Sequence, residues 1–358
     1  MSVTLDTYRL LGRSGLRVSP LALGTRFFGA DSGWGTHTDD ARKLFDTYVE
    51  RGGNFIDTAN TYADGNSEKL VGEFTRDNRE SLVLATKYTL LRRPVDPNSG
   101  GNHRKSMIAS VEASLRRMNT DYLDLLYLHW WDFLTPVEEI LRGMDDLVRQ
   151  GKVLYVGISD TPAWQVSRMQ AIADLRGWSP LVAVQIEYSL LERTVERDLI
   201  PMAREMGLGV VLWSPLANGV LTGKYSRADL TEPSVDAIRE RNNDEATRKN
   251  IALTSGHLTE RGLTIAEVVK QVATELGKTP SQVALAWTLH NPGVTAPIVG
   301  ARTLAQLEDN LGALDVEFDT AHLARLDEAS AIDLGFPHEL LARHGAEVFG
   351  SHMIEPRR

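Results

Sequence analysis

The sequence predicts a closed (β/α)₈ barrel, and three observations support this fold class. Short apolar segments alternate with amphipathic helical segments eight times along most of the chain. The apolar segments are continuous rather than alternating in hydrophobicity, as in residues 123–128, which is typical of parallel strands covered on both faces. An open doubly wound sheet is the alternative, but it expects a Gly-x-Gly-x-x-Gly turn after the first strand, and Gly24-Thr-Arg-Phe-Phe-Gly29 does not supply one.

The expected elements follow one another in a regular order. Residues 8–18 should form a hairpin around the Ser14-Gly15 turn, and this hairpin could close one end of the barrel. The eight expected strands comprise residues 21–24, 55–58, 82–87, 123–128, 153–158, 181–186, 209–213 and 296–299. Helices are expected at residues 39–51, 67–75, 107–118, 137–148 and 162–176, with Pro162 in the first turn of the last one and Gly52 and Gly151 as helix-ending residues.

The domain organisation follows from the absence of an internal repeat or an interdomain linker, so residues 1–358 are expected to form one barrel domain. Two segments exceed the usual length of a connection: residues 216–263, and the tail formed by residues 331–358. Long connections in a compact domain are usually lids, pocket walls or disordered segments. The tail is therefore a possible pocket wall.

Composition excludes several classes of function. The formal charge of −9 argues against a nucleic-acid surface, which needs clustered Lys and Arg. The chain has no cysteine, so disulfides, thiolate catalysis and Cys-ligated metals are excluded, and no metal site is expected. Because it has neither an apolar signal core nor a run of about 18 apolar residues, a cytoplasmic protein without a membrane partner is expected. The sequence leaves the oligomeric state open.

Polar residues stand where the expected strands end. Active sites of such barrels lie at the carboxyl ends of the strands. The residues found there are Thr25, Asp57, Tyr62, Lys87, His129, Ser159, Gln185, Trp213 and the turn at Gly300. A Lys and a His that end apolar strands are unusual, because removing an ionisable group from water costs several kcal/mol unless it is partnered. Asp57 is the natural partner of Lys87.

These residues are suited to delivering a proton. Lys87, held by Asp57, should stabilise the tyrosinate form of Tyr62 and so lower a phenol pKa that starts at about 10. Tyr62 would then act as a general acid near neutral pH, while His129 polarises the substrate oxygen. Taken singly, Lys87 could be a surface residue and His129 a core histidine. Their common position at one edge of consecutive units favours a site.

Several longer motifs resemble the aldo-keto reductase family. They are Gly53-Asn-Phe-Ile-Asp-Thr-Ala-x-x-Tyr62, Ala-Thr-Lys87, Asp-Leu-Leu-Tyr-Leu-His129, Val-Gly-Ile-Ser159, Trp-Ser-Pro-Leu216 and Val-Gly-Ala-Arg302, within a likeness that spans about residues 8–314. The resemblance implies a TIM barrel that moves a hydride between NADPH and an aldehyde or ketone. It also implies that Asp57, Tyr62, Lys87 and His129 are the catalytic residues.

The resemblance further implies an NADP(H) site. Ser159 and Gln185 would hold the nicotinamide carboxamide, and Trp213 would stack on the ring. The full set of cofactor-binding residues would be Thr25, Asp57, Ser159, Asp160, Gln185, Trp213, Ser214, Pro215, Leu216, Gly219, Lys224, Gly300, Arg302, Thr303, Gln306, Asp309 and Asn310. Arg302 favours NADPH over NADH, since Arg is the usual partner of a 2′-phosphate. A solvated Arg at a helix start is the alternative.

Three positions depart from the family pattern. Asp160 stands where Asn is usual, and Asp309 stands where Glu is usual. Arg26 follows Gly-Thr where an apolar or amide residue is common, which places a cation near the substrate mouth. A substrate that carries a carboxylate or phosphate would benefit from Arg26. A salt bridge from Arg26 to Asp31 or Asp132 would explain it equally well.

The expected substrate pocket is aromatic. Its residues would be Arg26, Phe27, Trp34, Tyr88 and Trp130. Such a mouth suits a flat or ring-shaped carbonyl compound. Residues 96–106 resemble the family branch that holds aryl-alcohol dehydrogenases and reductases of deoxysugar pathways, so the partner is expected to be a small aldehyde or ketone, aromatic or sugar-like.

Two other classes of function stay open at this level. A regulatory subunit resembling the potassium-channel β-subunits would keep the barrel and the cofactor but turn over slowly. A lyase or aldolase would use Lys87 as a Schiff-base amine. An Asp57 that holds Lys87 protonated argues against the second class.

Overall fold

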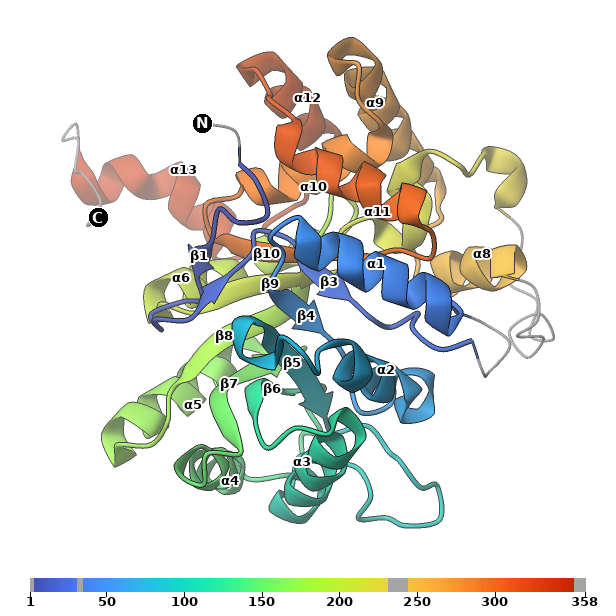
Figure 1. Cartoon of the computed structure of the whole chain (residues 1–358). Coiled ribbons are helices and arrows are strands. Elements are labelled where there is room, and N and C mark those ends of the chain that lie inside the picture. The colour runs from blue at the N-terminus through green and yellow to red at the C-terminus, as the bar shows by residue number, and fades with distance from the viewer. Residues whose placement is uncertain (1–2, 31–34, 231–243, 351–358) are drawn as a thin grey trace.

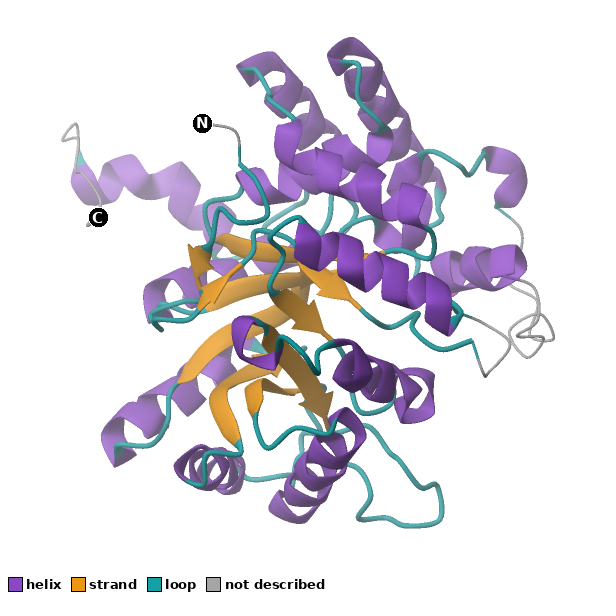
Figure 2. Ribbon diagram, viewed as in Figure 1, coloured by secondary structure: helices purple, strands orange, loops and turns teal. Residues whose placement is uncertain are grey.

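The computed structural model describes residues 3–30, 35–230 and 244–350, and its centre is a closed barrel of parallel strands (Figure 1; Figure 2). The eight strands pair in the order β10-β3-β4-β5-β6-β7-β8-β9. They are β3 Ala22–Gly24, β4 Phe55–Asp57, β5 Val83–Tyr88, β6 Leu123–Leu128, β7 Val153–Ser159, β8 Leu181–Glu187, β9 Gly209–Trp213 and β10 Val294–Gly300. Each lies within two residues of an expected strand. The predicted (β/α)₈ fold is confirmed.

The hairpin formed by β1 (Arg9–Leu10) and β2 (Arg17–Val18) closes the amino-terminal end of the barrel. Leu11 and Val18 are fully buried and belong to an apolar cluster inside the barrel. The same cluster contains Phe55 and Val182, which stand at the starts of β4 and β8. Apolar packing fills this end, and polar chemistry is left to the opposite end of the strands.

Helices surround the barrel on its outer side, as the purple ribbons in Figure 2 show. They are α1 Thr38–Glu50, α2 Asn66–Phe74, α3 Arg104–Met118, α4 Val137–Arg149, α5 Ala163–Arg176, α6 Leu199–Met206, α8 Asp244–Thr254, α9 Glu260–Leu276, α10 Pro280–His290, α11 Leu304–Leu311, α12 Thr320–Ser330 and α13 His338–Phe349. The 3₁₀ turns are η1 Tyr62–Gly65, η2 Arg79–Ser81, η3 Thr194–Glu196, η4 Ala217–Thr222, η5 Arg227–Asp229 and η6 Gly312–Asp315. Pro162 is the residue before α5 rather than part of its first turn.

The helix α4 illustrates why these segments fold as they do. Val137, Ile140, Leu141, Met144 and Leu147 recur at the three- and four-residue spacing of one helix face, and all are buried. Acidic residues occupy the first turn of α4, and a basic residue occupies its last turn. Both placements complement the helix dipole. Sequence periodicity alone therefore accounts for this helix.

The two long segments contain helices of their own. Residues 216–263 include η4, α8 and the start of α9. In the tail, α13 lies on the opposite side of the molecule from α8 (Figure 1). Arg197 donates a hydrogen bond to the carbonyl of Asp333, and His338 lies 3.6 Å from the carboxylate of Asp198. The described part of the tail thus adjoins the start of α6.

A buried network fixes α2 against β5. The carboxylate of Glu68, fully buried in α2, accepts hydrogen bonds from the Thr86 hydroxyl at 2.6 Å and from the Arg117 guanidinium at 2.6 Å. Thr86 directly precedes Lys87, and η1 with Tyr62 directly precedes α2. The network therefore sets the position of the Tyr62 segment relative to the strand that carries Lys87.

Two buried helix glycines test how tightly the helices pack. A Cβ at Gly72 would collide with the main chain of Met118, whereas a Cβ at Gly143 would lie 3.1 Å from the flexible Met107 sulfur. We expect Gly72→Ala to lower the free energy of unfolding by about 1–3 kcal/mol, because a main chain cannot move aside. We expect a smaller loss for Gly143→Ala, since Met107 can change rotamer. Urea unfolding of the two variants measures the difference, and equal losses would contradict this account.

Candidate active site

A buried ion pair lies at the carboxyl ends of β4 and β5. Lys87 has no exposed side-chain surface, and its ammonium pairs with the carboxylate of Asp57. The same ammonium donates to the carbonyl of Thr58 at 2.8 Å. The other Asp57 oxygen accepts a hydrogen bond from the Gln185 amide at 2.8 Å, across the barrel from β8. Residues from three strands therefore meet at this point.

The surroundings of Lys87 keep it charged. Burial on its own would lower the pKa of Lys87, but the charge of Asp57 and the neighbouring Tyr62 phenol outweigh burial and raise this pKa above its ordinary value. The Lys87 nitrogen lies 5.0 Å from the centre of the Tyr62 ring. A permanent positive charge thus lies directly beside the phenol.

His129 follows β6 and faces the same phenol. Its ring centre lies 6.1 Å from that of Tyr62, with the two planes at 77°. Its backbone N–H donates to the carbonyl of Tyr88 at 3.1 Å. Burial, reinforced by the positive charges of Lys87 and Arg26, lowers the pKa of His129 to about 2. The imidazole is therefore neutral at physiological pH and carries one N–H that it can donate.

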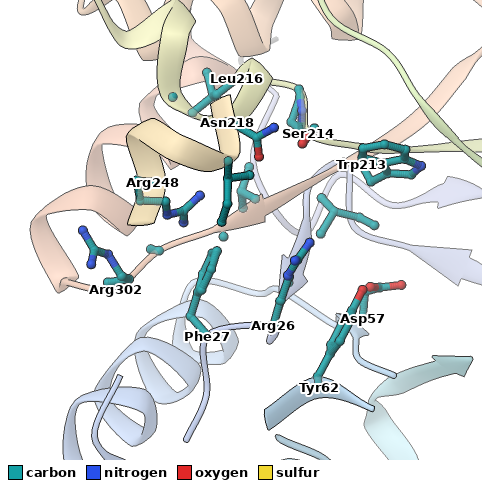
Figure 3. Close-up of a pocket in the computed structure, with 18 of the residues that line it drawn as sticks. Arg26, Phe27, Asp57, Tyr62, Trp213, Ser214, Leu216, Asn218, Arg248 and Arg302 are labelled. Atoms are coloured by element: carbon teal, nitrogen blue, oxygen red, sulfur yellow. The ribbon is translucent and has the colours of Figure 1, made fainter. Parts of the chain in front are cut away.

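An elongated cavity of about 780 Å³ begins at Tyr62 and His129. Figure 3 shows Tyr62, Asp57 and Trp213 at one end and Arg248 and Arg302 at the other. The expected residues that line it are Arg26, Phe27, Asp57, Tyr62, His129, Trp130, Ser159, Asp160, Gln185, Trp213, Ser214, Pro215, Leu216, Gly219, Lys224, Gly300, Arg302, Gln306, Asp309 and Asn310. Lys87 lies beneath this surface, fully buried.

Besides Lys87, three expected residues in the described part of the chain do not line the cavity. Tyr88 is fully buried in the core and donates to the carbonyl of Asn102, because adjacent strand residues face opposite ways and Lys87 takes the inward position. Thr25 is buried, and its hydroxyl bonds to the Asp57 carbonyl and to Ser67. Thr303 caps α11 instead. The expected pocket residue Trp34 lies outside the described residues.

Around Trp213 the site offers unsatisfied and oriented polar groups. The Ser159 hydroxyl is buried on the cavity wall without a hydrogen-bond partner among the described residues. The Trp213 indole N–H donates to the Asp160 carboxylate at 2.9 Å, which fixes the ring plane. Burial raises the pKa of Asp160 to about 6, and the bond from Trp213 offsets this only in part. A buried hydroxyl of this kind calls for a polar ligand group, and the carboxamide of a nicotinamide fits it.

Backbone strain gathers at the same edge. Asp160 after β7 has φ 41°, Ser214 after β9 has φ 51°, and Asn218 in η4 has φ 53°. Residues other than glycine rarely adopt positive φ, and each such case costs of order 1–3 kcal/mol. Ser214 and Asn218 both line the cavity, as does Asp160. Strain of this kind is concentrated at functional sites.

The far end of the cavity is built on the start of α11. Thr303 caps the helix by accepting a hydrogen bond from the Gln306 backbone N–H, and the Gln306 side chain accepts one from the Arg302 backbone N–H at 2.9 Å. Asn310 donates to the Gly300 carbonyl at 3.4 Å. The helix start and Arg302 both present positive charge, which suits a phosphate.

Some other lining residues come from segments without a sequence motif. Among them are Asn218, Arg248, Asn250, Ile251, Thr254, Ser281 and Leu285. Four of them belong to α8, where the Arg248 guanidinium lies 4.2 Å from the centre of the Phe27 ring. The sequence of α8 is polar, so apolar periodicity gave no signal for this wall. Only the length of residues 216–263 indicated it.

The described part of the chain contains neither a membrane-spanning helix nor a cluster of metal ligands. None of the helices described here has the length and apolar character needed to cross a membrane. Within the same part of the chain, no cluster of three or more His, Cys, Asp or Glu side chains is arranged to hold a metal ion.

Comparison with known proteins agrees with this geometry. Residues 20–331 match the family model described as Aldo/keto reductase family. The chain is 37% identical to norsolorinic acid reductase of Aspergillus flavus, over 98% of this chain and 87% of that protein. It is 36% identical to the aryl-alcohol dehydrogenase (NADP⁺) of Phanerodontia chrysosporium, over 91% of this chain and 86% of that protein. It is 38% identical to the uncharacterized oxidoreductase YrpG of Bacillus subtilis, over 90% of this chain and 95% of that protein. The chain therefore belongs to the aldo/keto reductase family.

Proposed function

We propose that this protein is an NADPH-dependent reductase that converts an aldehyde or ketone to an alcohol, with Tyr62 as the proton donor. The buried pair of Lys87 and Asp57 beside the Tyr62 phenol is the observation that carries the proposal. The residues Asp57, Tyr62, Lys87 and His129 are its catalytic group. When bound, the nicotinamide would supply the hydride to the carbonyl carbon.

Side chains of the protein supply the proton and stabilise the charge that develops. Tyr62 donates its hydroxyl proton to the carbonyl oxygen, and the nearby Lys87 ammonium stabilises the tyrosinate that remains. Neutral His129 donates its N–H to the same oxygen and holds the carbonyl against the phenol. Asp57 keeps the ammonium in place. An amine held charged is a poor Schiff-base nucleophile, which argues against a lyase.

The cofactor would lie along the cavity with its nicotinamide at the Trp213 end. Ser159 and the Gln185 amide would bind the carboxamide, and the Trp213 ring would stack on the nicotinamide. Ser214, Pro215, Leu216, Gly219 and Lys224 would hold the pyrophosphate, and Gly300, Arg302, Gln306, Asp309 and Asn310 the adenosine. Thr25 and Thr303 would contribute through the main chain around them, since their hydroxyls are engaged elsewhere.

The choice of NADPH and of an aromatic or ring-shaped substrate rests on two kinds of support. Arg302 stands at the end of the cavity where a 2′-phosphate would lie, and one relative is named for NADP⁺. Phe27 and Trp130 line the substrate end. Relatives are named for norsolorinic acid and for aryl alcohols. These enzyme names favour catalysis over a slow regulatory subunit.

Replacing the proposed acid tests the mechanism. We expect Tyr62→Phe to lower kcat for the NADPH-dependent reduction of benzaldehyde by about 10²–10⁴-fold, because the phenylalanine ring has no proton to donate. NADPH affinity, followed by tryptophan fluorescence, should persist. Tyr8→Phe is the matched control, since its hydroxyl bonds only to the Gly52 carbonyl, at 3.0 Å, among the described residues.

Equal turnover by Tyr62→Phe and the native protein would remove Tyr62 from its role. A native protein that binds NADPH but reduces none of a panel of aromatic aldehydes and keto-sugars would instead support the regulatory-subunit reading.

The preference for NADPH over NADH tests whether Arg302 binds the 2′-phosphate. Removing a charged hydrogen bond to the 2′-phosphate costs about 1.5–3 kcal/mol, so Arg302→Ala should weaken NADPH binding roughly 10- to 100-fold and leave NADH binding little changed. Arg51→Ala is the control, because Arg51 pairs with Glu308 of α11, the helix that follows Arg302, and does not line the cavity. Equal losses for the two cofactors would contradict a 2′-phosphate contact.

The raised pKa of Asp160 can be tested by measuring the free energy of unfolding instead of activity. Its pKa is raised from 3.8 to about 6, so the stability provided by its neutral form is complete below about pH 4 and is lost as the pH rises through 6. Asp160→Asn keeps an oxygen for the Trp213 indole and cannot ionise. Its free energy of unfolding relative to the native protein should rise by about 3 kcal/mol between pH 4 and pH 8. Unfolding in urea across that range measures the change, and a difference independent of pH would refute the assignment.

A further inference from the structure

We propose that the carbonyl substrate carries an anionic group, a carboxylate or a phosphate, and that Arg26 binds it. This inference rests on the proposed carbonyl reduction and narrows its substrate class.

Arg26 stands at the substrate end of the cavity. It follows β3 and is exposed, and it lines the cavity together with Tyr62, His129 and Trp130. In Figure 3 its side chain extends into the cavity between Phe27 and Tyr62. Its positive charge contributes to the low pKa of His129, so its field reaches the proposed carbonyl site. A group bound there would lie beside the reacting carbonyl.

The charge of Arg26 is not neutralised by a carboxylate in the described part of the chain. No ion pair within 4.0 Å joins it to a described residue, including Asp64, which also lines the cavity. Asp132 is the expected alternative partner, but one of its oxygens accepts hydrogen bonds from the backbone N–H groups of Leu134 and Thr135. Its other oxygen accepts from Asn102 and from the Thr135 hydroxyl. The second alternative partner, Asp31, lies outside the described residues.

The acidic residues deeper in the cavity also have partners. Asp57 pairs with Lys87, Asp160 accepts from Trp213, and Asp309 accepts from the Thr279 hydroxyl at 2.8 Å. At the substrate end the guanidinium of Arg26 therefore remains available to an anionic group, since no ion pair joins it to a described carboxylate. A guanidinium in such a site binds a carboxylate or phosphate through two parallel hydrogen bonds, which also orients the ligand.

Pairs of substrates that differ only in the anionic group show how much that group contributes to kcat/KM. The carboxylate pairs are 4-carboxybenzaldehyde and 3-carboxybenzaldehyde, each against its neutral methyl ester, whose ring is also suited to the aromatic wall. The phosphate pair is glyceraldehyde 3-phosphate against glyceraldehyde. The quantity measured is the ratio of kcat/KM for the anionic compound to kcat/KM for its neutral partner, at pH 7 with saturating NADPH.

We expect this ratio to exceed 1 for at least one pair in the native protein. Arg26→Met should lower that ratio by about 10- to 100-fold, which corresponds to the loss of one charged hydrogen-bonded contact. Arg26→Lys should restore part of it, because the charge returns without the paired geometry. Arg168→Met is the control and should keep the native ratio, since Arg168 pairs with Glu138 on the outer helices. The pair that shows the effect identifies carboxylate or phosphate.

Two results would overturn the inference. They are a native ratio at or below 1 for every pair, and a ratio that Arg26→Met leaves unchanged. Reduction of the neutral aldehydes with either of these results would leave the proposed reductase standing. Failure to reduce any compound, neutral or anionic, would remove the proposed function itself.

Discussion

The structure depends on keeping an ammonium charged inside the barrel. A fully buried Lys87 would cost several kcal/mol without partners. Asp57 and the Thr58 carbonyl offset that cost, and Gln185 holds Asp57 from the far side of the barrel. Removing one member would leave a buried charge uncompensated, so the three strands are tied to one arrangement of side chains.

The charge of Lys87 also acts on the neighbouring Tyr62 and His129. It lies beside the Tyr62 phenol, and together with burial it keeps His129 neutral. The network of Glu68, Thr86 and Arg117 then holds the segment that carries Tyr62 against the strand that carries Lys87. Apolar packing under the hairpin closes the other end of the barrel. Apolar packing and the buried ion pair therefore lie at opposite ends of the strands.

Sequence patterns located the strands and the group at their ends because both leave a local signature. A continuous apolar run such as residues 123–128 marks a strand buried on both faces, and His129 after it marks the carboxyl end. Sequence patterns did not predict which way a side chain at a strand end faces. Tyr88 and Lys87 are adjacent in β5, and burial of Lys87 inside the barrel sends Tyr88 outward to the helices. Thr25 was likewise expected at the cavity and instead bonds to Ser67.

Local patterns in the chain predict the order of elements, the closed barrel and the acid, phenol, lysine and histidine at one edge, because hydrophobic period and strand-end position are local properties. Which groups meet depends on the folded arrangement. The bond from Gln185 to Asp57 joins residues 128 positions apart, and the indole of Trp213 reaches Asp160 across 53. The wall that α8 adds to the cavity is equally a product of folding. Such contacts depend on the closure of the sheet, which brings distant segments together. They produce no periodic pattern in the sequence.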